Sequence, residues 1–170
     1  METNHKIDTE NDVFIQAADL VEYTDKFIYL TGKAGTGKTT FLHYIKNITR
    51  KNTVILAQTG VAAYNCGGVT INSFFQIPSE PIPPYDYKIL EPTWKDRLDS
   101  IREIINKYNF SKRNIINNLE LVIIDEASMV RADTMDAIDT ILRAVRNNPN
   151  VAFGGVQVLL IGDAFQLPPV

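Results

Sequence analysis

Four short runs of aliphatic and aromatic residues recur along the chain. They are residues 27–30, 54–57, 121–124 and 156–161, and polar positions are almost absent from them. Each run has the length of a β-strand, and strands that are apolar on both faces are typical of parallel sheets. Amphipathic segments alternate with them. This pattern predicts an α/β fold, a parallel sheet with helices on both faces.

The segments between the runs have helical spacing. The first begins after a cap at Asn11 or Asp12, and further helices are expected over 41–48, 97–108, 111–119 and from about Asp133 to Pro149. Residues 78–92 are rich in proline, which predicts a surface loop. We therefore expect one domain over residues 1–170 with a proline-rich and helical insertion at about 78–118.

Composition narrows the class of protein. A length of 170 residues suits one domain with a real core. The net charge of −3 and pI of about 5.4 predict that any nucleic-acid contact is local. Cys66 is the single cysteine, which excludes an intrachain disulfide and predicts a buried thiol in a reducing compartment. With no signal region and no apolar run of about 18 residues, a cytoplasmic or nuclear protein without a membrane span is expected.

The strongest chemical signal follows the first predicted strand. Residues 32–39 have the pattern Gly-x4-Gly-Lys-Thr between a strand and a helix, which is a complete phosphate-binding loop in its required context. A glycine-rich turn with an incidental lysine is the alternative, and these flanks disfavour it. The residues predicted to bind ATP are Gly32, Gly35, Thr36, Gly37, Lys38, Thr39 and Thr40. Lys38 would reach the β- and γ-phosphates, and the Thr39 hydroxyl would ligate Mg²⁺.

Two acidic residues end the third predicted strand. Asp125 at its tip would hold Mg²⁺, and Glu126 would orient and deprotonate the attacking water. A solvated acidic pair is the alternative, which the phosphate-binding loop disfavours. Two carboxylates favour hydrolysis over phosphate transfer, because a hydrolase needs a positioned base.

A third segment follows the last predicted strand. Gln166 lies after Gly162-Asp163, where ligands bind in such sheets, so it is a candidate for contacting the γ-phosphate. A solvated turn fits Gln166 equally well. The chain stops directly after this segment, which predicts that it belongs to a longer protein.

Four segments in this order resemble motifs of superfamily-one helicases, and specifically of the Pif family. They are residues 32–40, residues 58–63 with 67–75, residues 124–130, and the Gly-Asp-x-x-Gln-Leu-Pro-Pro segment at 162–169. The resemblance implies a RecA-like P-loop NTPase, the first motor domain of an ATP- and Mg²⁺-dependent DNA helicase. It implies movement from five-prime to three-prime on single-stranded DNA, with roles in DNA repair, recombination and telomere maintenance.

The resemblance also implies residues that contact single-stranded DNA, namely Thr59, Gly60, Asn72, Ser73 and Phe74. An aromatic ring such as that of Phe74 stacks on a base with about 1–3 kcal/mol. Packing in the core is the alternative role for Phe74 and Phe75. For at least one of the two, it is the better interpretation.

Two positions depart from the family's pattern, and one of its motifs has no clear counterpart. Gln58 stands where the family usually has proline, and Asn72 where it has histidine. No clear adenine-reading glutamine motif precedes the phosphate-binding loop, and Gln16 is the nearest candidate.

The family's second motor domain, with the arginine that completes the ATP site, is absent from these residues. Since an arginine finger contributes about 10³–10⁵ in rate, the 170 residues alone are predicted to bind Mg-ATP weakly and to hydrolyse it negligibly. An ATP-dependent switch without translocation is the alternative function, and a small-molecule kinase a more distant one. The expected helices over 97–119 also carry several basic residues, which form either a basic stripe or a solvated helix face. They are Arg97, Arg102, Lys107, Lys112 and Arg113.

Overall fold

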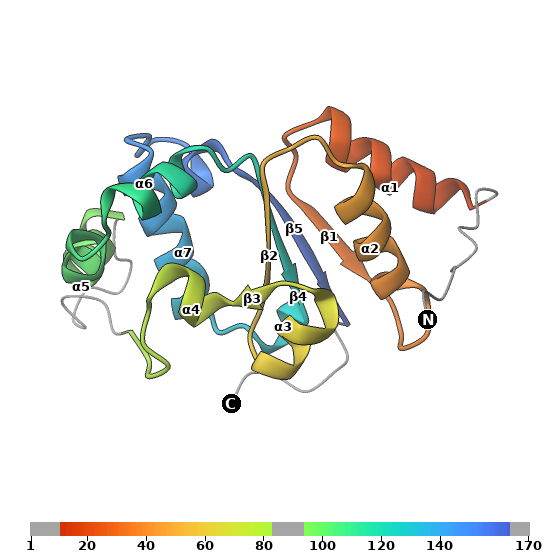
Figure 1. The fold of residues 1–170 in the computed structure, drawn as a ribbon, viewed down its shortest axis with the longest axis horizontal. Coiled ribbons are helices and arrows are strands. Elements are labelled where there is room, and N and C mark those ends of the chain that lie inside the picture. The colour runs from red at the N-terminus through yellow and green to blue at the C-terminus, as the bar shows by residue number, and fades with distance from the viewer. Residues whose placement is uncertain (1–10, 83–93, 164–170) are drawn as a thin grey trace.

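The computed structural model describes residues 11–82 and 94–163, with the side chains of residues 94–96 and 100 excepted. Its centre is a five-stranded sheet in the order β1-β5-β4-β2-β3, and every neighbouring pair is parallel (Figure 1). The strands are β1 Ile28–Thr31, β2 Thr53–Ala57, β3 Val69–Thr70, β4 Leu121–Asp125 and β5 Gln157–Gly162. The predicted α/β fold with a parallel sheet is confirmed.

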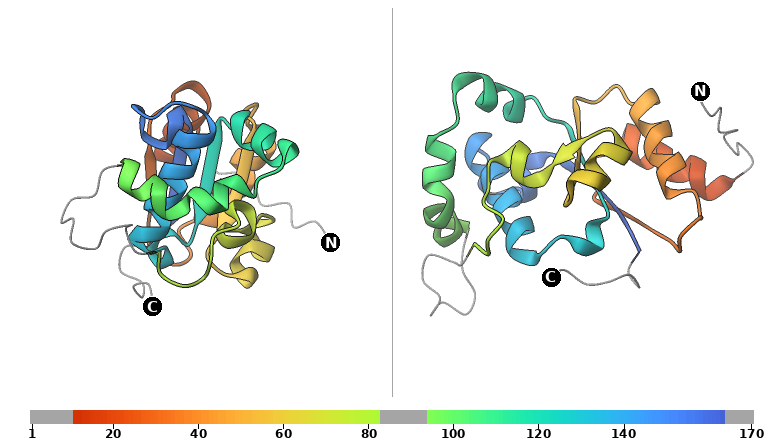
Figure 2. Two further views of the ribbon diagram at one scale, coloured as in Figure 1. Left: turned by 90° about the vertical axis from the view of Figure 1, so that its left-hand side faces the viewer. Right: turned by 60° about the horizontal axis from the view of Figure 1, so that its bottom comes forward.

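Helices cover both faces of this sheet. They are α1 Asp12–Tyr23, α2 Lys38–Ile48, α3 Gly60–Cys66, α4 Ile71–Phe75, α5 Trp94–Asn106, α6 Phe110–Asn117 and α7 Ala132–Val145, with 3₁₀ helices η1 Ala127–Met129 and η2 Ala152–Gly155. Helices α1 and α2 lie on one side, and α4 to α7 lie on the other (Figures 1 and 2).

The central strand β4 shows why both faces need cover. Leu121 and Ile123 are fully buried against α1 and α2, whereas Val122 and Ile124 are fully buried on the α7 side. Successive side chains of a strand point to opposite faces, so an uninterrupted apolar run requires a helical layer on each side.

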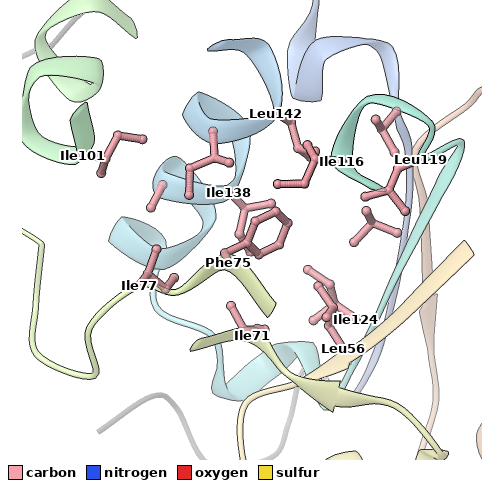
Figure 3. Packing of buried hydrophobic residues seen from close by; sticks show 14 of the residues in the cluster. Leu56, Ile71, Phe75, Ile77, Ile101, Ile116, Leu119, Ile124, Ile138 and Leu142 are labelled. Atoms are coloured by element: carbon pink, nitrogen blue, oxygen red, sulfur yellow. The ribbon is translucent and has the colours of Figure 1, made fainter. Parts of the chain in front are cut away.

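The helices expected in the insertion belong to the core of the domain. Both α5 and α6 pack against α7, and Ile101 and Ile116 are buried in the same cluster as Phe75 (Figure 3). The Tyr108 hydroxyl donates to the Phe75 carbonyl, and burial raises the pKa of this phenol. Much of the predicted proline-rich loop, residues 83–93, lies outside the described part.

Helix α3, strand β3, helix α4 and the two 3₁₀ helices were not predicted. Helix α3 begins where Thr59 caps it by accepting a hydrogen bond from the Ala62 N–H at 3.2 Å. Strand β3 and helix α4 are too short to leave a periodic pattern. The helix expected from Ser111 begins instead at Phe110, because Asn109 caps it. No helix among the described residues is long and apolar enough to span a membrane.

Candidate nucleotide and nucleic-acid site

The phosphate-binding loop joins β1 to α2 at the carboxyl edge of the sheet. Gly35 and Gly37 have φ angles of 79° and 91°, which residues other than glycine rarely adopt. A Cβ on Gly32 would lie 2.6 Å from Thr36 Oγ1. The Thr36 side chain in turn donates to the Lys33 carbonyl at 2.8 Å, so the loop is held in a tight turn by its own polar groups.

The Lys38 side chain folds back over this loop. Its ammonium donates to the carbonyl oxygens of Gly32 at 2.5 Å and Lys33 at 3.0 Å. These contacts place a positive charge within the loop, at the N-terminus of α2 where the helix dipole also favours an anion.

A pocket of about 360 Å³ lies beside the loop, between α2, α3 and the end of β4. Its lining residues are Thr39, Thr59, Val61, Ala62, Asn65, Cys66, Asp125, Glu126 and Met129. The register of the parallel strands explains this grouping, since Ala57 at the end of β2 is paired with Asp125 at the end of β4. Helix α3 follows β2 directly and therefore lies at the same edge (Figure 1).

The two carboxylates at the end of β4 have different surroundings. Burial raises the pKa of Asp125, and the backbone N–H of Glu126 and the charges of Lys38 and His43 oppose this rise. Glu126 has a φ angle of 52°, an uncommon conformation for a residue with a side chain, where the strand turns into η1. A strained residue beside the pocket is a common feature of functional sites.

The oxygen groups of the pocket suit a magnesium ion. Thr39 supplies a hydroxyl and Asp125 a carboxylate, and both line the same cavity. Mg²⁺ prefers such hard oxygen ligands and is usually held by one or two protein groups together with phosphates and water. The predicted metal pair, Thr39 and Asp125, is thus brought together by the fold.

The residues predicted to contact DNA lie on α3 and α4. Thr59 lines the pocket and caps α3, while Gly60 is exposed at the first position of that helix. Ser73 is exposed on α4, and its N–H donates to the Thr70 hydroxyl at 3.2 Å. Thr59 and Thr70 therefore use their side-chain oxygens to begin two neighbouring helices.

Asn72 and Phe74 have partners within the chain. The Asn72 amide donates to the carbonyls of Ile77 at 3.2 Å and Pro78 at 2.8 Å. The Phe74 ring is half-buried, with the Lys112 ammonium 3.6 Å from its centroid and the Phe75 ring packed edge-on at 4.9 Å. Phe75 is fully buried, so it is the one of the two phenylalanines that belongs to the core.

For Gln16 and Gln166, the structure adds no support to the predicted contacts with the nucleotide. Gln16 is exposed on α1 and is not among the lining residues of the pocket, so the structure adds no support for adenine recognition by this side chain. Gln166 lies outside the described residues, and its proposed contact with the γ-phosphate stays a prediction.

Several lining residues were not predicted as part of a site. Val61, Ala62 and Asn65 reach the pocket because α3 turns them toward Asp125, and Met129 does so from η1. Cys66 is buried as predicted, and burial raises the pKa of its thiol. The helical spacing of residues 61, 62, 65 and 66 could have identified this face, had residues 60–66 been recognised as a helix.

The suggested basic stripe is largely engaged in contacts within the chain. Arg97 pairs with Asp136 at 3.2 Å, and Arg102 with Asp99 at 2.6 Å. Arg113 donates to the carbonyls of Tyr108 and Ile105, and Lys112 covers Phe74. These contacts favour structural roles for the four side chains.

A parallel sheet with a Gly-x4-Gly-Lys-Thr loop after its first strand defines a P-loop nucleoside triphosphatase fold. The family model of the PIF1-like helicases matches residues 7–170. The chain therefore belongs to the PIF1-like helicase family, as its motifs predicted.

Curated relatives and solved structures agree with this assignment. The ATP-dependent DNA helicase PIF1 of Emericella nidulans is 38% identical over 152 residues, which cover 84% of this chain and 18% of that protein. The human ATP-dependent DNA helicase PIF1 is 37% identical over 144 residues, covering 84% of this chain and 20% of that protein. The chain thus spans about a fifth of the length of these relatives.

Crystal structures from Bacteroides have the same fold. Pif1 of Bacteroides sp in complex with ADP-AlF4 matches with a TM-score of 0.77 and 44% identity, over 94% of this chain and 33% of that one. Bacteroides Pif1 bound to ssDNA matches with a TM-score of 0.76 and 43% identity, over 94% of this chain and 33% of that one.

Proposed function

We propose that this chain is the ATP-binding motor domain of an ATP-dependent DNA helicase that moves from five-prime to three-prime on single-stranded DNA. One observation carries the proposal: a single pocket joins Thr39 of the phosphate-binding loop, the Asp125-Glu126 pair and the Thr59 end of α3. In this proposal, the nucleotide chemistry and the predicted DNA contact at Thr59 share one cavity. The relatives named as ATP-dependent DNA helicases, and the relatives crystallised with ADP-AlF4 and with ssDNA, support both halves of the proposal.

In this proposal the loop binds the phosphates of ATP. Lys38 exchanges the carbonyls of Gly32 and Lys33 for phosphate oxygens, and the α2 N-terminus adds its dipole. Thr39 and Asp125 would hold Mg²⁺, which would supply positive charge beside the phosphates. Glu126 accepts a proton from the attacking water and holds that water in line.

The DNA half of the proposal uses the edge formed by α3 and α4. Thr59 and Gly60 lie at the N-terminus of α3, where a backbone N–H without a partner in the helix can donate to a phosphate of DNA. Ser73 is exposed on the next helix, and Phe74 offers a half-buried ring. Because Thr59 lines the nucleotide pocket, a change at the γ-phosphate has a short route to bound DNA.

The 170 residues by themselves are proposed to be poor catalysts. Motors of this kind close a second domain over the nucleotide, and the arginine it supplies contributes about 10³–10⁵ in rate. We expect the isolated chain to bind Mg-ATP weakly and to show negligible turnover. Rapid ATP hydrolysis by these 170 residues alone would contradict this part of the proposal.

Strand separation by the full-length protein tests the direction of movement. Two duplexes of equal length are compared, one with a single-stranded five-prime tail and one with a three-prime tail, each with and without Mg-ATP. We expect ATP-dependent unwinding of the five-prime-tailed duplex and none with Glu126→Gln. Unwinding only from the three-prime tail would reverse the proposed polarity, and equal unwinding without ATP would refute a motor.

A further inference from the structure

An arginine–aspartate fork lies at the start of α7. Arg131 donates from Nε to Asp133 Oδ1 at 2.9 Å and from Nη2 to Asp133 Oδ2 at 2.8 Å. Both side chains reach outside their helix: Arg131 Nη1 donates to the Ser79 carbonyl at 3.1 Å, and Asp133 Oδ2 accepts the Ile82 N–H at 2.8 Å. The fork thereby holds the segment that follows α4 against the N-terminal end of α7 (Figure 1).

One side of this fork is connected to the nucleotide pocket by a rigid turn. The Met129 N–H donates to the Glu126 carbonyl at 3.0 Å, and the Val130 N–H donates to the Ala127 carbonyl at 3.1 Å. Val130 is buried in the core that α7 shares with the sheet. This hydrogen-bonded turn therefore joins Glu126 to Arg131 within five positions of the chain.

The other side is connected to the predicted DNA contacts. The Asn72 amide holds the carbonyls of Ile77 and Pro78, immediately before the residues that the fork binds. Residues 77–82 are thus tied to α4 at one end and to α7 at the other. The same short helix carries Ser73 and Phe74.

We propose that Arg131 and Asp133 are positioning residues that couple occupancy of the nucleotide pocket to DNA binding on α4. This inference rests on the proposed function and adds a route for its coupling. Coupling needs a physical element whose arrangement both sites bias, and spatial intermediacy alone does not establish it. In this proposal the fork is that element, because Arg131 directly follows the 126–130 turn in the chain and the fork is hydrogen-bonded to Ser79 and Ile82 on the other side.

The same helix provides a matched control. Arg143 Nε donates to both carboxylate oxygens of Asp139, at 2.9 and 2.8 Å, and Asp139 Oδ1 accepts the Phe153 N–H at 2.5 Å. Arg143 also donates to the Pro149 carbonyl at 2.7 Å. This second fork is also an arginine–aspartate pair on α7, but its hydrogen bonds join the end of α7 to Pro149 and to Phe153 of η2 and not to residues 77–82.

The test measures the affinity of the full-length protein for fluorescein-labelled oligothymidylate, with and without Mg-ADP and aluminium fluoride. The ratio of the two Kd values is the coupling, and couplings between sites are typically about 5- to 150-fold. We expect this ratio to fall below about 2-fold in Asp133→Asn and in Arg131→Gln. Asp139→Asn and Arg143→Gln should keep the wild-type ratio.

Thermal unfolding of the same four variants separates coupling from stability. Similar losses of Tm at both forks, with the coupling lost only at Arg131 and Asp133, would support the proposal. An unchanged ratio in Asp133→Asn, or an equal loss in Asp139→Asn, would overturn it. If wild-type hydrolysis depends on DNA while these variants keep their coupling, only the fork proposal fails; hydrolysis that ignores DNA would refute the proposed function as well.

Discussion

Gly68 lies in the tightest backbone contact of the region between α3 and β3. A Cβ at this position would lie 2.3 Å from the Ile55 carbonyl oxygen, 2.8 Å from its carbon and 3.0 Å from the Ile55 Cβ. Two of the three contacts are with the backbone of β2, which cannot rotate away. Gly68→Ala would therefore push the chain away from β2, beside the two-residue pairing of Leu56 with Val69 and Ala57 with Thr70.

The magnitude follows from the geometry. The closest contact falls about 0.7 Å short of the 3.0 Å below which real Cβ contacts essentially never occur. Overpacking of this kind costs about 1–3 kcal/mol, and a lost hydrogen bond of the β2–β3 pair adds about 0.5–1.5 kcal/mol. We expect Gly68→Ala to lower the free energy of unfolding by about 2–4 kcal/mol.

Urea unfolding of the wild type and two variants measures this cost. Gly60→Ala is the control, because a Cβ there meets nothing within 4 Å and the residue begins α3, where alanine favours the helix. It should be neutral or slightly stabilising. If Gly68→Ala unfolds within about 0.5 kcal/mol of the wild type, as a surface substitution would, the close approach of β3 to β2 is wrong.

Three further predictions concern the pocket and its supports. The Arg131 guanidinium lowers the pKa of Asp133 from 3.8 to about 2, so the ionised carboxylate stabilises the fold fully above about pH 4. About 1–2 kcal/mol of the free energy of unfolding should be lost as the pH falls toward 2, and acid titration of Asp133→Asn should lack this loss. Arg146 donates to the carbonyls of Asn117, Leu119 and Gly154, so Arg146→Met should cost about 2–4 kcal/mol in urea unfolding, and an unchanged midpoint would contradict these contacts. In the full-length protein, Glu126→Gln should reduce ATP hydrolysis about 10²–10⁴-fold with fluorescent-nucleotide affinity retained, whereas Lys38→Ala should weaken that affinity. Retained hydrolysis in either variant would argue against the assigned roles.

Apolar runs and one loop were enough to predict the parallel sheet and the phosphate-binding loop. Residues 121–124 have no polar side chain, so both faces of their strand must be covered to keep these side chains from water, as in a parallel sheet with helices on both faces. The proximity of Thr39 and Asp125 also followed from the sequence, because the carboxyl ends of parallel strands meet at one edge.

The elements that carry the predicted DNA contacts were harder to predict. Helix α4 and strand β3 are too short to show a periodic pattern in the sequence. Thr59 was predicted as a DNA contact, and its role as the cap of α3 was not predicted. The hydrogen bonds of Asn72 and of the Arg131–Asp133 fork depend on tertiary placement. The fork joins residues about 50 positions apart, a distance over which local sequence carries no signal.

ATP hydrolysis by the full-length protein, measured with and without single-stranded DNA, tests the central claim most directly. The account predicts strong stimulation by DNA, abolished by Glu126→Gln, because the Thr59 end of α3 and the Asp125-Glu126 pair line one pocket. Hydrolysis that proceeds at the same rate without DNA would contradict the coupling of this pocket to a DNA track.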